Sequence, residues 1–306
     1  SYSISKAPDG SVINLVQEFG DERVLDTAIA ETAIISMGIG AAMAGSRPIC
    51  EILFADFLGV AFDEIFNQAA VTRYVTGGQS KIPMVIKVGL HGAVPGLAPQ
   101  HGHAGMECFF AHSPGLKIAL PSTPYDAKGL MISAIRDDNP VMYFENISTY
   151  GVEGEVPEEP YTVPLGKADV KRVGDDVTLL GFAVMVHRAL AAAAELEKEG
   201  ISCEVVDPRT LVPLDKAAIL DSVRKTGRVV VLDEGCRTCG TGAELVAIIA
   251  EEALTYLKAP IKRLAMPDTS VPAGANMLEH ISVTKEKIID AVRECVKGGT
   301  LAISST

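Results

Sequence analysis

The chain of 306 residues contains no tryptophan, and aromatic side chains make up only 5% of it. Its core must therefore be built from Ala, Val, Ile and Leu, the mixture found in parallel sheets that are covered by helices. Long apolar runs are also missing, since none approaches the ~20 residues needed to span a bilayer. The first twenty residues do not resemble a secretory signal. These absences argue against a protein that acts in or on a membrane.

Positive charge is scarce as well. The chain has 27 Lys and Arg against 39 Asp and Glu, a net charge of −12. Such a surface repels phosphate backbones and anionic lipid, so we expect no nucleic-acid and no membrane partner. The six cysteines are scattered, several within apolar stretches. That pattern favours reduced, buried thiols, as in a bacterial cytoplasm or a mitochondrial matrix. Of these two compartments, we expect the cytoplasm.

Hydrophobic patterning divides the chain into two α/β domains, 1–150 and 167–306, joined by a linker at 151–166 that holds three prolines and four glutamates. Strands alternate with helices through short connections, which predicts two doubly wound, mostly parallel sheets. The expected strands are 23–26, 48–54, 83–88, 116–120, 141–145, 177–181, 203–207 and 229–233. The expected helices are 31–44, 58–76, one capped by Thr123, 187–199 and 215–225.

The stretch from Gly89 to Gly105 has no hydrophobic period and holds five glycines, two prolines and three of the six histidines. A long loop of this composition inside a compact domain is usually functional. His101 and His103 could be two metal ligands, with Glu107 four residues further on, but no other ligand is evident nearby. A metal site is therefore the less favoured interpretation of this loop.

Two short motifs are weak. Gly38-Ile-Gly40 begins like a dinucleotide-binding fingerprint, but it lies inside an expected helix and its sixth position is Met43. Small residues that allow close helix packing are the better interpretation. Cys236 and Cys239 form a CxxC pair without a second pair nearby, so we interpret them as an incidental loop pair.

Many segments together resemble, in order, the β subunits of the thiamine-diphosphate-dependent pyruvate, branched-chain 2-oxo acid and acetoin dehydrogenases. The resemblance runs from about residue 10 to the C-terminus. It is carried by Phe19–Thr27, Ile29–Glu31, Arg47–Phe57, Asn67–Ala70, Arg73–Tyr74, Gln100–His101, Pro114–Lys117, Tyr125–Leu130, Arg136–Pro140, Val205–Thr210, Pro213–Asp215 and Lys225–Val231.

This resemblance implies an N-terminal thiamine-pyrimidine-binding domain, a C-terminal transketolase-like domain and specific site residues. Glu31 matches the acid that hydrogen-bonds the aminopyrimidine ring and activates the cofactor. Phe57 matches the aromatic residue that stacks on that ring. His101 matches the active-site histidine. Because the usual Gln-His-Ser-Gln is replaced by Gln100-His101-Gly102-His103, His103 is the second candidate for that role.

The resemblance also implies what the chain binds. Asp137 and Asn139 match positions that help to hold a structural monovalent cation such as K⁺. The chain has no Gly-Asp-Gly followed by Asn at 25 to 30 residues, the pattern expected to hold the diphosphate and Mg²⁺. Both are then expected on an α subunit, within an α₂β₂ heterotetramer that serves a lipoyl-bearing acyltransferase core. The substrate is expected to be a small 2-oxo acid or acetoin.

Alternative hypotheses remain at this point. The chain could be the pyrimidine-domain subunit of a split transketolase-type enzyme, which would need no lipoyl partner. It could also be a non-catalytic assembly subunit, because it begins later than the family pattern, without the usual first helix and strand. A nucleotide-binding regulatory protein is disfavoured by the incomplete glycine fingerprint.

Overall fold

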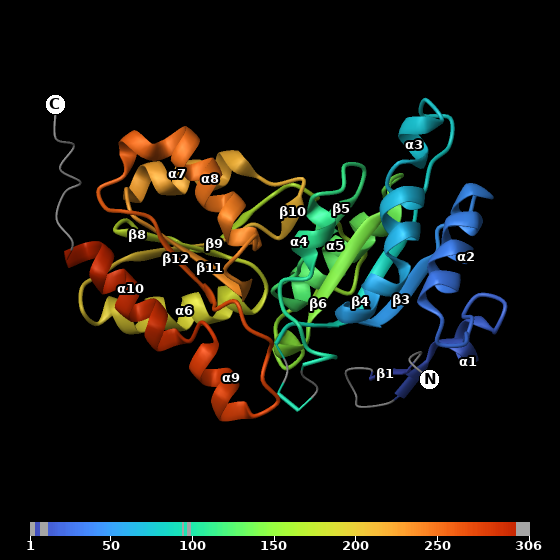
Figure 1. Cartoon of the computed structure of the whole chain (residues 1–306), viewed down its shortest axis with the longest axis horizontal. Helices are drawn as coiled ribbons and strands as arrows, with labels where there is room; N and C mark the ends of the chain where they lie inside the picture. The colour runs from blue at the N-terminus through green and yellow to red at the C-terminus, as the bar shows by residue number, and fades with distance from the viewer. Residues whose placement is uncertain (1–3, 7–11, 94, 97–98, 298–306) are drawn as a thin grey trace.

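The computed structural model describes residues 4–6, 12–93, 95–96 and 99–297, which form two α/β domains side by side (Figure 1). Each domain is built on a five-stranded sheet. A separate two-stranded antiparallel sheet, β1 (Ile4–Lys6) and β2 (Val12–Asn14), and a short α1 (Leu15–Phe19) lie at the N-terminal edge. Among the described residues, no helix has both the length and the apolar character needed to cross a membrane.

The first sheet has the strand order β10-β5-β6-β4-β3. Its four N-terminal strands are parallel: β3 (Ile49–Phe54), β4 (Val85–His91), β5 (Lys117–Ala119) and β6 (Val141–Asn146). The fifth, β10 (Thr210–Val212), comes from the second half of the chain and pairs antiparallel with β5. The two domains are therefore joined by a shared sheet as well as by side-chain packing.

The second sheet has the order β12-β11-β8-β9-β7 and is parallel except at one edge. Its strands are β7 (Asp169–Arg172), β8 (Val177–Gly181), β9 (Cys203–Asp207), β11 (Val229–Cys236) and β12 (Lys262–Met266). The strands predicted at 177–181 and 203–207 are confirmed to the residue. The helices of this domain are α6 (Val184–Glu197), α7 (Lys216–Thr226), α8 (Thr241–Ala253), η4 (Leu254–Tyr256), α9 (Ala275–Ile281) and α10 (Lys285–Lys297).

The helices of the first domain are less regular. They are α2 (Glu31–Met43), η1 (Ala55–Ala61), η2 (Glu64–Ala69), α3 (Thr72–Val75), α4 (Glu107–Ala111), α5 (Pro124–Arg136) and η3 (Ile147–Thr149). The single α-helix predicted at 58–76 is wrong, because η1 is a 3₁₀ helix, η2 a π helix and only α3 is α-helical. Apolar spacing reports which residues face the core but not the hydrogen-bond pitch. In α3 the hydroxyls of Thr72 and Thr76 also bond carbonyls one turn back, which competes with the backbone ladder.

The strand predicted at 23–26 is wrong. The segment begins in a turn and pairs with no strand of any sheet that the structure describes. Leu25 is 64% exposed there, so this short apolar stretch is not buried in a sheet. The start of α5 is confirmed: the Thr123 hydroxyl accepts a hydrogen bond from the Asp126 amide at 3.1 Å, with Pro124 in the first turn.

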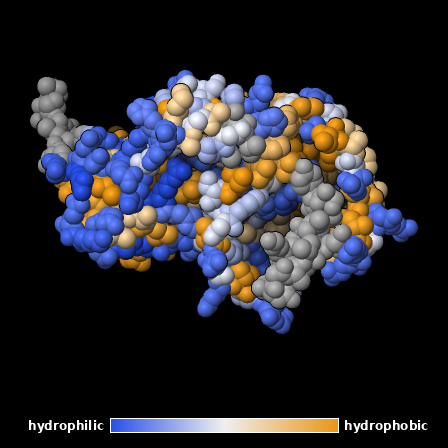
Figure 2. Space-filling model, turned by 90° about the horizontal axis from the view of Figure 1, so that it is seen from below, coloured by the Kyte–Doolittle hydropathy of each residue, from blue (hydrophilic) through white to orange (hydrophobic). Residues whose placement is uncertain are grey.

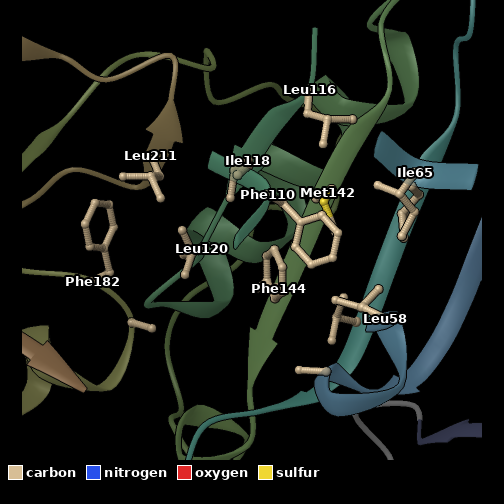
Figure 3. Close-up of a cluster of buried hydrophobic side chains, with 14 of the residues drawn as sticks. Leu58, Ile65, Phe110, Leu116, Ile118, Leu120, Met142, Phe144, Phe182 and Leu211 are labelled. Atoms are coloured by element: carbon tan, nitrogen blue, oxygen red, sulfur yellow. The ribbon is translucent and has the colours of Figure 1, made fainter. Parts of the chain in front are cut away.

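One continuous cluster of buried apolar side chains fills the first domain and extends into the second (Figure 3). Phe110, Phe144 and Leu58 form its part beneath the first sheet, while Phe182 and Leu211 contribute from the second domain. Burial shared across a domain boundary resists relative motion of the two domains. The ends of the strands that meet at this boundary are consequently held in fixed relative positions.

Candidate active site

Of the predicted site residues, Phe57, His101, His103 and Glu31 lie at the carboxyl ends of the strands of the first sheet, where open α/β sheets bind ligands. β3 ends at Phe54 and runs directly into η1, which carries Asp56 and Phe57. β4, parallel to β3, ends at His91 and leads into the histidine loop, defined here as residues 92–106. Segments far apart in the sequence thus come together at one end of the sheet.

His101 lies against two aromatic rings. Its ring centroid is 5.0 Å from that of Phe54 and 5.1 Å from that of Phe57, with edge-on geometry in both cases. Phe54 and Phe57 contact each other in the same way at 5.9 Å. The predicted aromatic residue and the first-ranked histidine are therefore brought into direct contact, on a half-buried apolar surface.

His103 is held differently. Its Nδ1–H donates to the Asp56 carboxylate, and its backbone amide also donates to Asp56 Oδ1, at 3.4 Å. The Asp56 side chain is 9% exposed, whereas that of His103 is 43% exposed. A carboxylate on Nδ1 fixes the tautomer and orientation of an imidazole and leaves Nε2 free to exchange protons.

Glu31 is the first residue of α2, at the same end of the sheet. α2 runs antiparallel to the strand that follows it, so the start of the helix lies beside the end of β3. The hydroxyl of the neighbouring Thr32 donates to the Val60 carbonyl of η1 at 3.0 Å, which ties the two elements together. Ile29 is 91% exposed, so the apolar surroundings expected for Glu31 are not supplied by its own segment.

Asp137 and Asn139 lie at the opposite end of the sheet, just before β6. Lys117 pairs with one Asp137 oxygen, while the other accepts from the amide and side chain of Asn139 at 2.9 and 2.8 Å. Burial alone would raise the pKa of Asp137, but these donors outweigh it and lower the pKa. Arg73 donates to Asn139 Oδ1 at 2.6 Å.

Backbone carbonyls near these two residues already accept hydrogen bonds from a positively charged side chain. Arg47 donates to the carbonyls of Ile135 and Asp137 at 2.9 and 2.8 Å. Across the part of the chain that the structure describes, no three His, Cys, Asp or Glu side chains are arranged to hold a metal ion. K⁺ at Asp137 and Asn139 stays a prediction.

The two weak motifs have structural roles. A Cβ on Gly38 would lie 2.3 Å from Cys50 Sγ, so this glycine allows α2 to pack closely on β3, as the small-residue interpretation predicted. Cys236 is the last residue of β11 and Cys239 lies in the loop after it; both are free thiols, and the other four cysteines are free as well. Glu107 does not join His101 and His103 as a ligand, because its carboxylate faces His91.

Sequence reasoning missed Phe54, Asp56 and His91. Phe54 and Asp56 flank the predicted Phe57 in the matched segment 47–57, so the signal was an acid and a second ring next to an expected site residue. Their relation to the two histidines depends on where the loop returns to the sheet. That return is a long-range contact that local patterns do not report.

Comparison with known proteins agrees with this geometry. The description "Transketolase, pyrimidine binding domain" matches residues 8–151, and "Transketolase, C-terminal domain" matches residues 166–288. The chain is 48% identical to the 2-oxoisovalerate dehydrogenase subunit beta of Bacillus subtilis, covering 92% of this chain and 86% of the relative. It is 46% identical to the acetoin:2,6-dichlorophenolindophenol oxidoreductase subunit beta of Cupriavidus necator, covering 95% and 85%.

Two further relatives bear on the alternatives. The chain is 42% identical to the pyruvate dehydrogenase E1 component subunit beta of Rickettsia felis, covering 92% of this chain and 85% of the relative. A solved structure titled "Split gene transketolase, inactive beta4 tetramer" matches with a TM-score of 0.76 and 25% identity, covering 92% of this chain and 86% of that one. The chain therefore belongs to the β subunits of the thiamine-diphosphate-dependent 2-oxo acid and acetoin dehydrogenases, which are built from a transketolase-type pyrimidine-binding domain and C-terminal domain.

Proposed function

We propose that this chain, together with an α subunit, cleaves a small 2-oxo acid or acetoin and passes the acyl group to a lipoyl group on an acyltransferase core. The observation that carries the proposal is the meeting of Phe54, Asp56, Phe57, His101 and His103 at the end of the sheet next to Glu31. An apolar wall beside oriented proton donors and a carboxyl group suits the activation of a thiazolium cofactor.

The residues of the chain fit the pyrimidine half of thiamine diphosphate. When bound, this cofactor supplies the nucleophilic carbon and the electron sink for the bond that breaks. Glu31 would hold the aminopyrimidine ring by a hydrogen bond, and Phe57 would provide the flat apolar surface that excludes water. We assign the diphosphate and Mg²⁺ to the α subunit, which completes the site.

Between the two histidines, the contacts favour His103 as the residue that moves a proton. Asp56 orients its ring, whereas His101 packs between two phenyl rings. We propose that His103 protonates or deprotonates the substrate oxygen through Nε2, and that His101 shapes the pocket beside Phe57.

An exposed apolar surface supports the need for a partner. In Figure 2 hydrophobic side chains gather on the half of the molecule that holds the first domain. Around α2 and η1, large apolar side chains remain exposed on the part of the chain that the structure describes: Leu25, Ile29, Met37, Met43, Ile49, Val60 and Phe62. Apolar patches of this kind on a folded domain mark protein interfaces. We propose that the α subunit covers this surface and thereby desolvates Glu31.

The test is calorimetric titration of thiamine diphosphate with Mg²⁺ into this chain alone and into its complex with the α subunit. Binding only in the complex is expected. Tight binding by the chain alone would contradict the divided site, and absence of binding in both samples would favour a non-catalytic assembly subunit. A substrate screen with pyruvate, acetoin, branched-chain 2-oxo acids and a ketose phosphate then separates the dehydrogenase function from a split transketolase.

A further inference from the structure

The histidine loop is closed at its base by a buried ion pair. His91 is the last residue of β4 and Glu107 is the first residue of α4, so the loop spans the sequence between them. His91 Nε2 lies 3.0 Å from Glu107 Oε2, and the two side chains are only 3% and 6% exposed. The pair therefore fixes the separation of the two ends of the segment that carries His101 and His103.

The first end of the loop rests on the second domain. Gly92 has a φ of +109°, and a Cβ there would lie 2.9 Å from Asn146 Nδ2 and 3.2 Å from Glu234 Oε1. The Ala93 amide donates to Glu234 Oε1 at 3.2 Å, and Asn146 donates to Glu234 Oε2 at 2.5 Å. The Glu234 carboxylate of β11 thus accepts hydrogen bonds from the start of the loop and from the end of β6.

The second end of the loop rests on the next residue of β11. Gly105 has a φ of +78°, and a Cβ there would lie 2.8 Å from the Cα of Gly235. Only glycine combines this backbone conformation with such a close approach. Both ends of the loop therefore contact Glu234 and Gly235 of the second domain, and the position of the loop depends on how the domains meet.

The charges around His91 favour its protonated form. Glu107 comes from α4, Asp56 from η1 and Glu234 from β11. Among the described residues, Asp233 and Cys108 lie close to Glu107, and Arg188 lies close to Glu234. Burial by itself would lower the pKa of His91, but Glu107, Glu234 and Asp56 outweigh it and raise the pKa above its usual 6.5. His91 Nδ1 and Glu107 Oε2 are both buried without a hydrogen-bond partner, so His91 and Glu107 interact as an ion pair at 3.0 Å. A residue selected for packing alone would avoid that arrangement.

We propose that His91 and Glu107 are positioning residues whose ion pair, docked on Glu234, holds the histidine loop so that His101 reaches Phe57 and His103 reaches Asp56. The role of this arrangement in catalysis rests on the proposed function. The ion pair of His91 and Glu107 docked on Glu234, called the clamp below, is a property of the isolated chain. Because the charged pair exists only while His91 is protonated, the order of the loop depends on pH.

Hydrogen exchange measured by mass spectrometry on peptides within residues 99–106 of the full chain tests the clamp. The samples are the wild type, His91→Gln, Glu107→Gln and the control His187→Gln. His187 is a second histidine at the domain boundary, where its Nε2 lies 2.6 Å from the Ser122 carbonyl oxygen, and it contacts another part of the first domain. Gln at either position removes the charge but keeps a polar side chain of similar size, so the variants should still fold.

At about pH 6, exchange in these peptides should be about tenfold faster in His91→Gln and Glu107→Gln than in the wild type, because the buried ion pair is lost. After correction for intrinsic exchange, the wild type should lose this protection as the pH rises through the pKa of folded His91 and should match His91→Gln once His91 is neutral. Equal protection of the wild type and His91→Gln at every pH would overturn the proposal. So would an equal loss in His187→Gln, which would indicate general loosening of the domain boundary.

Activity of the complex with the α subunit provides the second measurement. His91→Gln should lower kcat most strongly at the acidic end of the pH profile and leave the affinity for thiamine diphosphate unchanged. An unchanged kcat profile together with faster exchange would overturn the positioning role. If the wild-type complex shows no thiamine-diphosphate-dependent turnover, the proposed function fails. The exchange measurement would still show whether the ion pair of His91 and Glu107 orders the loop.

Discussion

The two domains are built on the same kind of sheet but differ in how their surfaces are completed. In the second domain α6, α7, α8 and α10 are regular α-helices, and few large apolar side chains between 167 and 297 are exposed. In the first domain the helical segment between β3 and β4 changes pitch twice, and exposed apolar side chains crowd around α2. Figure 1 shows α7 and α8 on one face of the second sheet and α6 and α10 on the other.

The second domain buries most of its apolar side chains within its own chain and is called self-sufficient here, whereas the first domain leaves many exposed and is called unfinished. A domain that buries its apolar residues within its own chain can use regular helices with their pattern facing inward. A domain that shares a site with another subunit must leave apolar and charged groups exposed until the partner arrives. The candidate site, the histidine loop and the irregular helices all lie in the unfinished domain.

The largest expected effect comes from Glu31. Glu31→Gln should reduce turnover of the assembled enzyme by roughly 10³-fold, because the carboxyl group that activates the cofactor is removed while the shape of the side chain is retained. Steady-state turnover with saturating thiamine diphosphate measures this. The matched control is Glu244→Gln, which alters an acidic residue in the first turn of α8 in the second domain. Equal loss of turnover in Glu31→Gln and Glu244→Gln would contradict the expected difference between the two domains.

The next effect concerns the two histidines. His103→Ala should lower kcat by about 10²-fold, because the proton-transfer group is removed. Asp56→Asn should lower kcat by about tenfold, because the His103 imidazole loses the carboxylate that orients it. His101→Ala should mainly weaken cofactor binding, because it opens the apolar surface beside Phe57. Separate measurement of kcat and of cofactor affinity distinguishes the two roles. A larger kcat loss for His101→Ala than for His103→Ala would reverse the assignment.

Sequence patterns predicted some elements of each domain and missed others: β7, β10, β12, α8, α9 and α10 of the second half of the chain were not expected. In the second domain β8 and β9 match their predicted bounds, because short buried strands between turns have an unambiguous pattern. In the first domain the strand expected at 23–26 is absent and the helix expected at 58–76 is broken. Both segments leave apolar residues exposed, so their apolar patterns do not report burial within this chain.

The site was predicted to the extent that its residues lie in matched segments. Glu31, Phe57 and His101 follow from the resemblance, and the structure brings Phe57 and His101 together. The roles of Asp56 and His91 could not be predicted, because each depends on a contact between residues far apart in the chain or on opposite sides of the histidine loop. Burial and pairing of such groups are tertiary properties that spacing does not encode.

A smaller effect is expected at the boundary between the domains. Asp207, at the end of β9, is fully buried and burial raises its pKa from 3.8 to about 6, although Ser122 and Lys171 oppose the shift. Between these two values native Asp207 holds a proton that the unfolded chain has released. The destabilisation caused by its charge is therefore complete above about pH 6 and disappears as the pH falls toward 3.8.

Asp207→Asn removes this titration while keeping the acceptor for the Arg209 amide, which lies 2.9 Å from Asp207 Oδ1. The unfolding free energy of the wild type, minus that of the variant, should increase by about 2 kcal/mol between pH 7 and pH 4. Urea denaturation followed by circular dichroism across this range measures the difference. A difference that stays constant with pH would show that Asp207 does not titrate in this window.

The smallest expected effect on the chain itself, and the sharpest contrast between the domains, is at the surface of α2. Met37 is 56% exposed there, and Met277 on α9 of the second domain is 65% exposed. Met37→Ser should change the unfolding free energy of the isolated chain by less than about 0.5 kcal/mol. It should nevertheless weaken assembly with the α subunit by about tenfold, because burial of this side chain at the interface is lost. Met277→Ser should leave that assembly unchanged, and sedimentation analysis of the mixed subunits compares the two. Equal weakening by both variants would mean that the α subunit contacts both domains, and the second domain would then be as unfinished as the first.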